Sequence, residues 1–97
     1  MRSGEEILKV LDDLKGEIKE KYKVKKIGLF GSYVNGGQKH SSDIDVLVKF
    51  DDGADLFDFV GLGLFLEEQL DLKVDVVPEN ALRSELRDSV LKQIAYV

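Results

Sequence analysis

The first part of the chain carries the apolar spacing of one helix face. Five apolar residues recur there every three or four positions: Ile7, Val10, Leu11, Leu14 and Ile18. This period predicts a helix that runs to about residue 21, with the intervening Lys and Glu residues facing water. Ser3, followed by Glu6 at the spacing of a capping box, predicts where the helix begins.

Three short runs rich in β-branched and other apolar residues predict strands. They are "VKKIGLF" at 24–30, "SDIDVLVKF" at 42–50 and "LKVDVVP" at 72–78. Pro78 has no N–H to donate and is expected to end the last strand. Asn35-Gly36-Gly37, between the first two runs, marks a tight reversal of the chain.

Two further helices are expected. Asp55 is a suitable N-cap for the first of them. Its expected buried side consists of Leu56, Phe59, Val60, Gly63 and Leu66. Gly61 and Gly63 weaken this helix by about 1 kcal/mol each, and close packing against a sheet is the favoured explanation for them. The second helix is expected over 80–95, with an apolar side formed by Leu82, Leu86, Val90, Leu91 and Ile94.

This order of elements predicts an α+β fold with one small mixed β-sheet that is covered by helices on one face. The 97 residues, of which 43% are apolar, are expected to form a single domain over 1–97. The absence of cysteine excludes a disulfide framework and a thiolate metal site. No apolar run approaches the roughly 20 residues of a membrane span, and the N-terminus does not resemble a secretory signal. We therefore expect a cytoplasmic protein without membrane contact.

The formal charge of −5 is unevenly distributed. Residues 1–26 hold eight Lys or Arg against six acidic residues, whereas residues 43–80 hold eleven acidic residues against two lysines. The acidic segment would repel a phosphate backbone, so we expect no direct binding of DNA or RNA. It fits a divalent cation, a basic partner, or nothing more than solubility.

Alternation along the strands gathers carboxylates on one face of the sheet. In the run 42–50, Ile44 and alternate residues point to the core, which sends Asp43 and Asp45 to the open face. In the run 72–78 the same rule sends Asp75 to the open face. If these two strands are neighbours, three carboxylates converge on one patch.

Three converging carboxylates repel one another, so their grouping asks for a counter-charge. Mg²⁺ prefers carboxylate oxygens together with water and substrate phosphates. Two such ions about 3.5–4 Å apart can activate an attacking oxygen and stabilise a leaving one. Gly31-Ser32 is a sharp turn after a strand, and its free N–H groups and hydroxyl are suited to hold phosphate.

Simpler explanations remain for each part. An Asp-x-Asp pair also occurs on edge strands, where outward acids prevent aggregation. A calcium loop is excluded, because "DIDVLV" lacks the required glycine and the later Glu. A Gly-Ser pair alone occurs in any turn. The combination of Gly-Ser, ten further residues, Asp-x-Asp and a third strand aspartate is much more specific.

At these residues the sequence resembles the DNA polymerase β-type nucleotidyltransferases, and most closely the minimal nucleotidyltransferases found with helical HEPN-type proteins in toxin–antitoxin pairs. The matching positions are Gly31, Ser32, Ser42, Asp43, Asp45 and Asp75. The resemblance extends over roughly residues 5–95. It implies the polymerase β-like fold and an enzyme of the protein adenylyltransferase type.

The resemblance also implies roles for these residues. NMP, most commonly AMP from ATP, would be transferred to a hydroxyl of a protein or a small molecule, with pyrophosphate leaving. Asp43 and Asp45 would hold two Mg²⁺ ions, while Asp75 would join one of them and take the acceptor's proton. Gly31 and Ser32 would hold the β- and γ-phosphates. A HEPN-type helical protein is the implied partner, and the chain would be its antitoxin.

The sequence departs from the family pattern at Asn35, where many members have an arginine. Asn35 can form hydrogen bonds but brings no charge to a triphosphate. Lys39, in the same loop, is one alternative source of charge, but a solvated loop lysine is the favoured interpretation. His40 is expected to be an exposed loop residue. Tyr33 is expected to pack the short helix after the turn, with stacking on a base as the alternative.

Three functions compete on this evidence. The first is the Mg²⁺-dependent nucleotidyltransferase described above. The second is a binding module with weak or no activity that neutralises a HEPN-type partner by direct contact, and Asn35 favours it. The third is a small structural domain, which requires the whole motif to be a coincidence.

Overall fold

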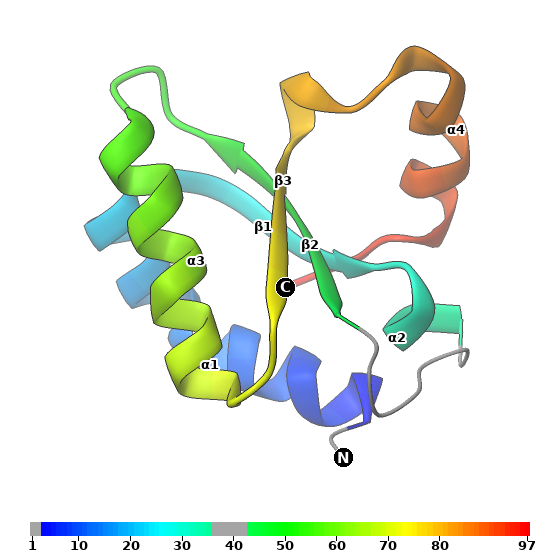
Figure 1. Cartoon of the computed structure of the whole chain (residues 1–97), viewed down its shortest axis with the longest axis horizontal. Coiled ribbons are helices and arrows are strands. Elements are labelled where there is room, and N and C mark those ends of the chain that lie inside the picture. The colour runs from blue at the N-terminus through cyan, green and yellow to red at the C-terminus, as the bar shows by residue number, and fades with distance from the viewer. Residues whose placement is uncertain (1–2, 36–42) are drawn as a thin grey trace.

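The computed structural model describes residues 3–35 and 43–97. The predicted positions Ser42, Lys39 and His40 lie outside the described residues. Along the chain the elements are α1 (Gly4–Tyr22), β1 (Val24–Phe30), α2 (Ser32–Asn35), β2 (Ile44–Phe50), α3 (Leu56–Leu70), β3 (Val74–Pro78), the 3₁₀ turn η1 (Glu79–Ala81), α4 (Ser84–Gln93) and β4 (Ala95–Tyr96). Figure 1 shows their arrangement.

The strands form one mixed sheet in the order β3-β2-β1-β4. β1 runs antiparallel to both β2 and β4, whereas β2 and β3 are parallel. A parallel pair needs a crossover connection, and α3 supplies it. The expected α+β fold with a mixed sheet is therefore confirmed, and the neighbouring placement of the second and third strands is the feature on which the predicted site depends.

α1 and α3 cover one face of the sheet (Figure 1), and the core lies between these two helices and the sheet. Ile7, Leu11 and Ile18 of α1 are fully buried, as their spacing predicts. They belong to one core cluster with the core-facing residues of β2, Ile44, Val46 and Val48. The predicted cap of α1 is also confirmed, because the backbone N–H of Glu6 donates to the Ser3 hydroxyl at 3.2 Å.

α3 begins as predicted but turns only part of the predicted side to the core, because Leu66 is buried and Phe59 packs against the core cluster. Asp55 caps it, accepting from the N–H of Asp58 at 3.1 Å, and Asp58 accepts in turn from the N–H of Asp55. The buried residues are Leu62, Leu66 and Leu70, whereas Leu56 and Val60, predicted to be buried, are exposed. α3 is apolar on nearly all sides, so periodicity alone selects no face and the packing partners decide.

The two glycines of α3 serve close packing. A Cβ on Gly61 would come within 3.0 Å of the Tyr22 ring of α1, and one on Gly63 would lie 3.8 Å from Val76 of β3. The tighter approach is therefore between helices, while the contact with the sheet is an ordinary one. This supports the prediction that the glycines allow close packing. At Gly61 the neighbour that packs closely is the helix α1.

The C-terminal segment differs from the single helix expected over 80–95. It divides into η1, α4 and the short strand β4, because Ala95 and Tyr96 pair with β1. Among the described residues of α4 none is buried, and Leu86 and Leu91, predicted to pack, remain 49% and 37% exposed. Two residues are too few to show a strand period, so the sequence held no signal for β4.

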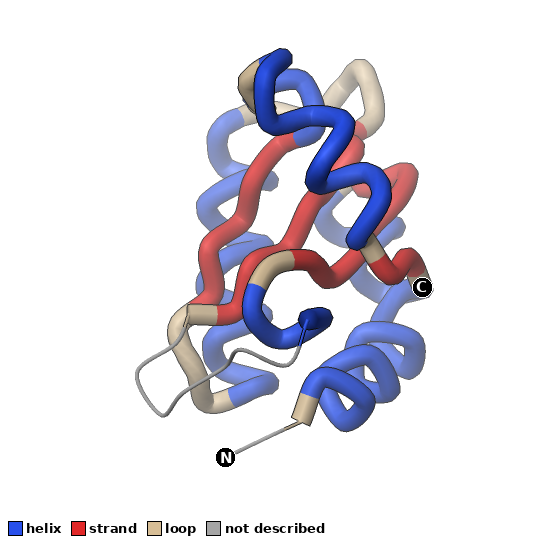
Figure 2. Tube along the Cα trace, turned by 90° about the vertical axis from the view of Figure 1, so that its right-hand side faces the viewer, coloured by secondary structure: helices blue, strands red, loops and turns tan. Residues whose placement is uncertain are grey.

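α4 lies on the side of the sheet opposite to α1 and α3 (Figures 1 and 2). A Cβ on Gly28 of β1 would come within 2.8 Å of the Ile94 side chain, which places Ile94 over the sheet on this second face. Leu47, whose side chain points to this same face, is 1% exposed. The second face is thus covered at its centre. No helix in the described ranges is long and apolar enough to span a bilayer.

Candidate active site

The turn after β1 requires glycine for two reasons. Gly31 has a φ of +80°, which side-chain-bearing residues rarely adopt. A Cβ at this position would also collide with the Asp45 carboxylate, because the turn lies directly against that side chain. The Gly31 carbonyl then accepts from the N–H of Val34 at 3.0 Å and opens α2. Gly31 and Ser32 are thereby held beside an aspartate from another strand.

The parallel register of β2 and β3 brings two of the predicted aspartates together. Asp45 and Asp75 are direct partners across the two strands, and Phe30 is the partner of Asp45 on the β1 side. Directly paired residues present their side chains on the same face, so both carboxylates lie on the face away from α1 and α3. Asp43 precedes β2 and is exposed beside them.

Two hydrogen bonds fasten the start of these strands. The N–H of Ile44 donates to the Lys73 carbonyl at 2.9 Å, and the N–H of Val74 donates to the Glu67 carboxylate at 3.1 Å. Each bond lies one residue away from a site aspartate. The relative positions of Asp45 and Asp75 are therefore set by the backbone, while their side chains remain accessible.

The closeness of the carboxylates affects the electrostatics of the site. The pKa of Asp45 is raised above its usual value, first by partial burial and then by the charges of Asp75 and Asp43. Both causes disfavour the ionised form. A cation bound between these groups would remove the repulsion.

The donor set fits a hard divalent cation in part. In the described ranges no three acidic or histidine side chains are gathered closely enough to hold an ion without rearrangement. Mg²⁺, however, is commonly bound by one or two carboxylates, with water and substrate phosphates as its other ligands. The pair Asp45 and Asp75 meets this smaller requirement, and Asp43 is near enough to raise the pKa of Asp45.

Two neighbours of the turn have roles that the sequence shows less clearly. Tyr33 is 3% exposed and belongs to the core, so the packing interpretation is confirmed and base stacking is excluded in this arrangement. Its buried hydroxyl has no hydrogen-bond partner in the described part of the chain. Gly4 was not predicted to matter, yet a Cβ there would collide with the Tyr33 carbonyl. The first residue of α1 thus supports α2, and no sequence pattern indicates this contact.

The comparison with known proteins gives the family. The sequence pattern of the family described as "Nucleotidyltransferase domain" matches residues 11–97. The chain belongs to this family. It is also 42% identical, over its full length, to the protein adenylyltransferase MntA of Thermococcus cleftensis, of which it covers 98%. The predicted resemblance and the predicted class of enzyme, a nucleotidyltransferase, are both confirmed.

Solved structures of nucleotidyltransferases have the same fold. One, described as a candidate minimal nucleotidyltransferase, is 32% identical with a TM-score of 0.76, covering 91% of this chain and 93% of the other. A toxin–antitoxin structure with AMP-PNP is 30% identical with a TM-score of 0.70, covering 88% and 70%. A Shewanella oneidensis complex of an MNT antitoxin with a tri-AMPylated HEPN toxin is 25% identical with a TM-score of 0.64, covering 92% and 70%.

Proposed function

We propose that this nucleotidyltransferase is a Mg²⁺-dependent adenylyltransferase that transfers AMP from ATP to a hydroxyl group of a protein partner. The observation that carries the proposal is the register of β2 and β3, which pairs Asp45 with Asp75 directly beside the Gly31 turn. Cation-binding carboxylates and a phosphate-holding turn are the two parts that such a transfer needs. The similarity to the adenylyltransferase MntA supports AMP as the transferred group.

In the proposed reaction the acceptor's hydroxyl oxygen attacks the α-phosphorus of ATP. A new oxygen–phosphorus bond forms, and the bond from the α-phosphorus to the bridging oxygen breaks, so that pyrophosphate leaves with the electron pair. The acceptor's proton passes to Asp75, which lies next to Asp45 on the open face. Mg²⁺, as two ions held by Asp43 and Asp45 with Asp75 on one of them, would neutralise the phosphate charge.

The turn is proposed to hold the rest of the triphosphate. Gly31 and Ser32 offer backbone N–H groups and a hydroxyl to the β- and γ-phosphates. Ser42, which lies outside the described residues, is proposed to assist, as the family resemblance implies. The closeness of Gly31 to Asp45 supports this assignment, because the phosphates and the cations must be contacted together.

We propose that the acceptor is a HEPN-type helical protein and that the chain acts as its antitoxin. Complexes of similar chains with such toxins support this partner. A second function, neutralisation by contact without transfer, is favoured by one observation, the replacement of the usual arginine by Asn35. We propose that transfer is the main function because the carboxylates and the turn are both retained.

Label transfer tests this proposal. The protein is incubated with Mg²⁺, ATP labelled at the α-phosphate and a lysate of its source organism. We expect a labelled protein with wild type and none with the Asp43→Asn/Asp45→Asn variant. Asp88→Asn, which alters an exposed acid on α4, is the matched control and should label as wild type does.

The two candidate functions predict different results. Transfer predicts that label requires both Mg²⁺ and intact aspartates. Neutralisation by contact predicts that no label is found and that a purified toxin is inhibited equally by wild type and by the double variant without ATP. That second result would reject adenylyl transfer as the function.

A further inference from the structure

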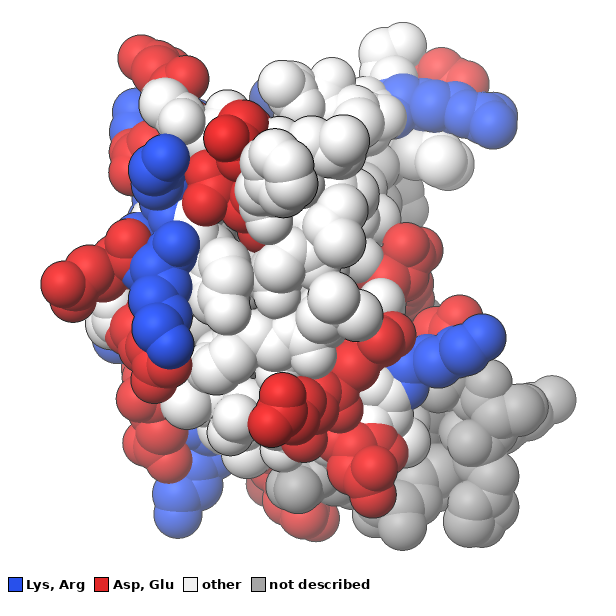
Figure 3. All heavy atoms as spheres, turned by 60° about the vertical axis from the view of Figure 1, so that its left-hand side comes forward, with Lys and Arg blue, Asp and Glu red and all other residues white. Residues whose placement is uncertain are grey.

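α3 exposes an apolar stripe on the surface that does not contact the sheet. Its four residues are Leu56, Phe57, Val60 and Leu64, which are 71%, 85%, 48% and 62% exposed. Leu56, Val60 and Leu64 follow one another at intervals of four, so they lie in one row along the helix. Figure 3 shows an apolar surface running down this side of the molecule, with acidic groups above and below it and basic groups along one edge. Apolar surface of this kind on a small chain marks a site of interaction.

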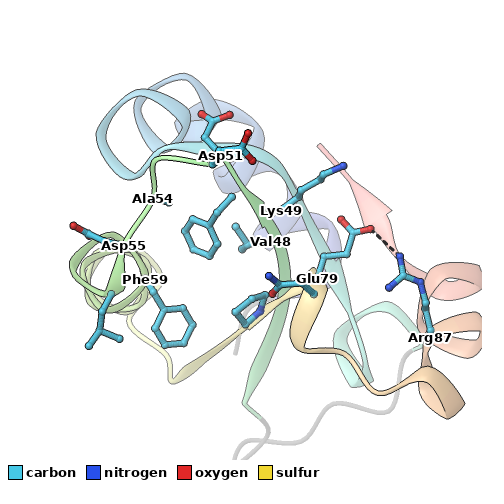
Figure 4. Close-up of a pocket in the computed structure, with 13 residues that line it drawn as sticks. Val48, Lys49, Asp51, Ala54, Asp55, Phe59, Glu79 and Arg87 are labelled. Atoms are coloured by element: carbon cyan, nitrogen blue, oxygen red, sulfur yellow. Dashed lines mark ion pairs between the residues drawn. The ribbon is translucent and has the colours of Figure 1, made fainter.

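An open hollow of about 790 Å³ adjoins the stripe, and Leu56 borders both. Its floor is apolar and includes Phe50, Phe59 and Pro78. Figure 4 shows Phe59 pointing into this space between α3 and the strands. An apolar floor suits the stem of a long side chain.

The rim of the hollow is predominantly acidic. It carries Asp51, Asp52, Asp55 and Glu79 against two cationic residues, Lys49 and Arg87. Arg87 is paired with Glu79 at 3.5 Å, as Figure 4 shows. Asp52, an exposed acid in the loop before α3, is thus available to a cation from outside.

The charges around α3 select the kind of partner. Residues 55–71 contain five acidic residues and neither Lys nor Arg, and one of the five, Asp58, is paired with Lys23 at 3.5 Å. A second copy of the chain, packed stripe against stripe, would bring acidic helix ends onto acidic helix ends. Like charges in contact oppose such a dimer, whereas a partner with Lys or Arg beside its apolar residues would find complementary charge.

We propose that the stripe of α3 and the adjoining hollow form a docking surface for a protein helix that has an apolar face with Lys or Arg at its ends. The helix packs along Leu56, Val60 and Leu64, and Phe57 lies between the two helices. One terminal Lys or Arg enters the hollow, where its stem covers the apolar floor and its charge meets Asp52 and its acidic neighbours.

This surface is separate from the transfer site. α3 begins where β2 has ended, whereas Asp45 and Asp75 lie near the beginnings of β2 and β3. A helix on the stripe therefore leaves the carboxylates accessible. The inference does not depend on adenylyl transfer, and a helical protein partner of the proposed type would meet its requirements.

Peptide binding tests the docking surface. The probe is a fluorescent, synthetic amphipathic helix with a leucine face and lysines at both ends, and its counterpart has glutamates at both ends. In anisotropy titrations we expect the lysine peptide to bind wild type at least tenfold more tightly than the glutamate peptide. Raising the salt concentration should reduce this difference by screening the charges.

Four variants locate the binding. Phe57→Ser should weaken the lysine peptide at least tenfold, because it removes a large apolar contact. Its control, Leu86→Ser, changes an exposed apolar residue of α4 and should bind as wild type does. Asp52→Asn should weaken binding about two- to fivefold, as expected for an exposed ion pair. Asp45→Asn should bind normally, which keeps this test independent of the proposed reaction.

Sedimentation equilibrium tests whether a second copy of the chain occupies the stripe instead of a partner helix. We expect wild type without peptide to remain monomeric over the concentrations of the titration. A dimer that Phe57→Ser abolishes would assign the stripe to a second copy and overturn the proposal. Equal binding of the two peptides, or no binding of either, would also overturn it.

Discussion

At the scale of single residues, Asp45 is an acidic group whose ionisation is affected by its neighbours. Burial and the charges of Asp75 and Asp43 raise its pKa in the folded chain, whereas in the unfolded chain these influences are lost. A carboxyl group with a raised folded pKa binds protons more readily when folded. Its contribution to stability is therefore present at acidic pH, below its unfolded pKa, and is lost as the pH rises through its folded pKa.

This predicts the effect of Asp45→Asn on stability without metal. In EDTA, the variant should be more stable than wild type at neutral pH, and the difference should decline as the pH falls below the pKa of Asp45. Urea unfolding at a series of pH values measures it. Added Mg²⁺ should then stabilise wild type but not the variant, since binding to the folded state raises its stability. Equal stabilisation of wild type and the variant by Mg²⁺ would show that Asp45 does not bind the cation.

Gly31 is the other residue whose identity the site requires. Gly31→Ala should lower the free energy of unfolding by about 1–3 kcal/mol, because it combines a positive φ with a contact on Asp45. Gly16→Ala is the matched control in α1, where no atom lies within 4 Å of the added Cβ. That change should instead raise stability by about 0.5–1 kcal/mol. Chemical denaturation of both variants gives their free energies of unfolding. A Gly31→Ala variant as stable as wild type would contradict the described turn.

At the scale of elements, local signals determine where helices start, and packing determines which side they bury. The caps at Ser3 and Asp55 are visible in the sequence because they depend on residues three positions apart. The buried side of α3 is not visible, because apolar residues surround the helix. In α1, by contrast, charged residues occupy the other faces, and the buried row follows directly from the spacing.

The cap of α3 gives a prediction at this scale. Asp55→Ala removes the carboxylate that accepts from the N–H of Asp58 and should cost about 0.5–2 kcal/mol of stability. The midpoint of urea unfolding measures the loss, with Asp88→Ala as the control on an exposed face of α4. An unchanged midpoint would show that α3 is held by packing alone.

At the scale of the whole molecule, the C-terminal segment closes the second face of the sheet. β4 pairs with β1, the N–H of Val97 donates to the Ile27 carbonyl at 3.1 Å, and Ile94 lies over Gly28. These contacts join residues about 70 positions apart in the sequence. These contacts do not cover the end of the sheet that carries Asp45 and Asp75, which lies beside the Gly31 turn.

A double-mutant cycle tests this contact between distant segments. Gly28→Ala should destabilise the chain by about 1–3 kcal/mol, because its Cβ has no room beneath Ile94. In an Ile94→Ala background the same change should cost less, since the two nearest obstructing atoms are gone and the Tyr96 ring, 3.0 Å from the added Cβ, remains. Unfolding free energies of the four proteins give the coupling. Additive costs would mean that Ile94 does not cover Gly28 in solution.

Local sequence patterns predict much of this protein's structure. The strand pattern places Asp43, Asp45 and Asp75 on one face, and the Gly-Ser turn precedes them at a distinctive spacing, so the candidate site was predictable. The family followed from the resemblance of these residues to a known motif. The placement of the aspartates and the helix starts depend on alternation within a strand and on short-range capping, which are properties of neighbouring residues.

The remaining features of the fold and the site depend on contacts between distant segments of the chain. The parallel register that sets Asp45 against Asp75, the approach of Gly31 to Asp45, the strand β4 and the exposed stripe of α3 all join segments distant in the chain. Such contacts depend on how whole elements pack. A pattern within one segment carries no information about which other segment will meet it, and that is why these features emerged only from the folded molecule.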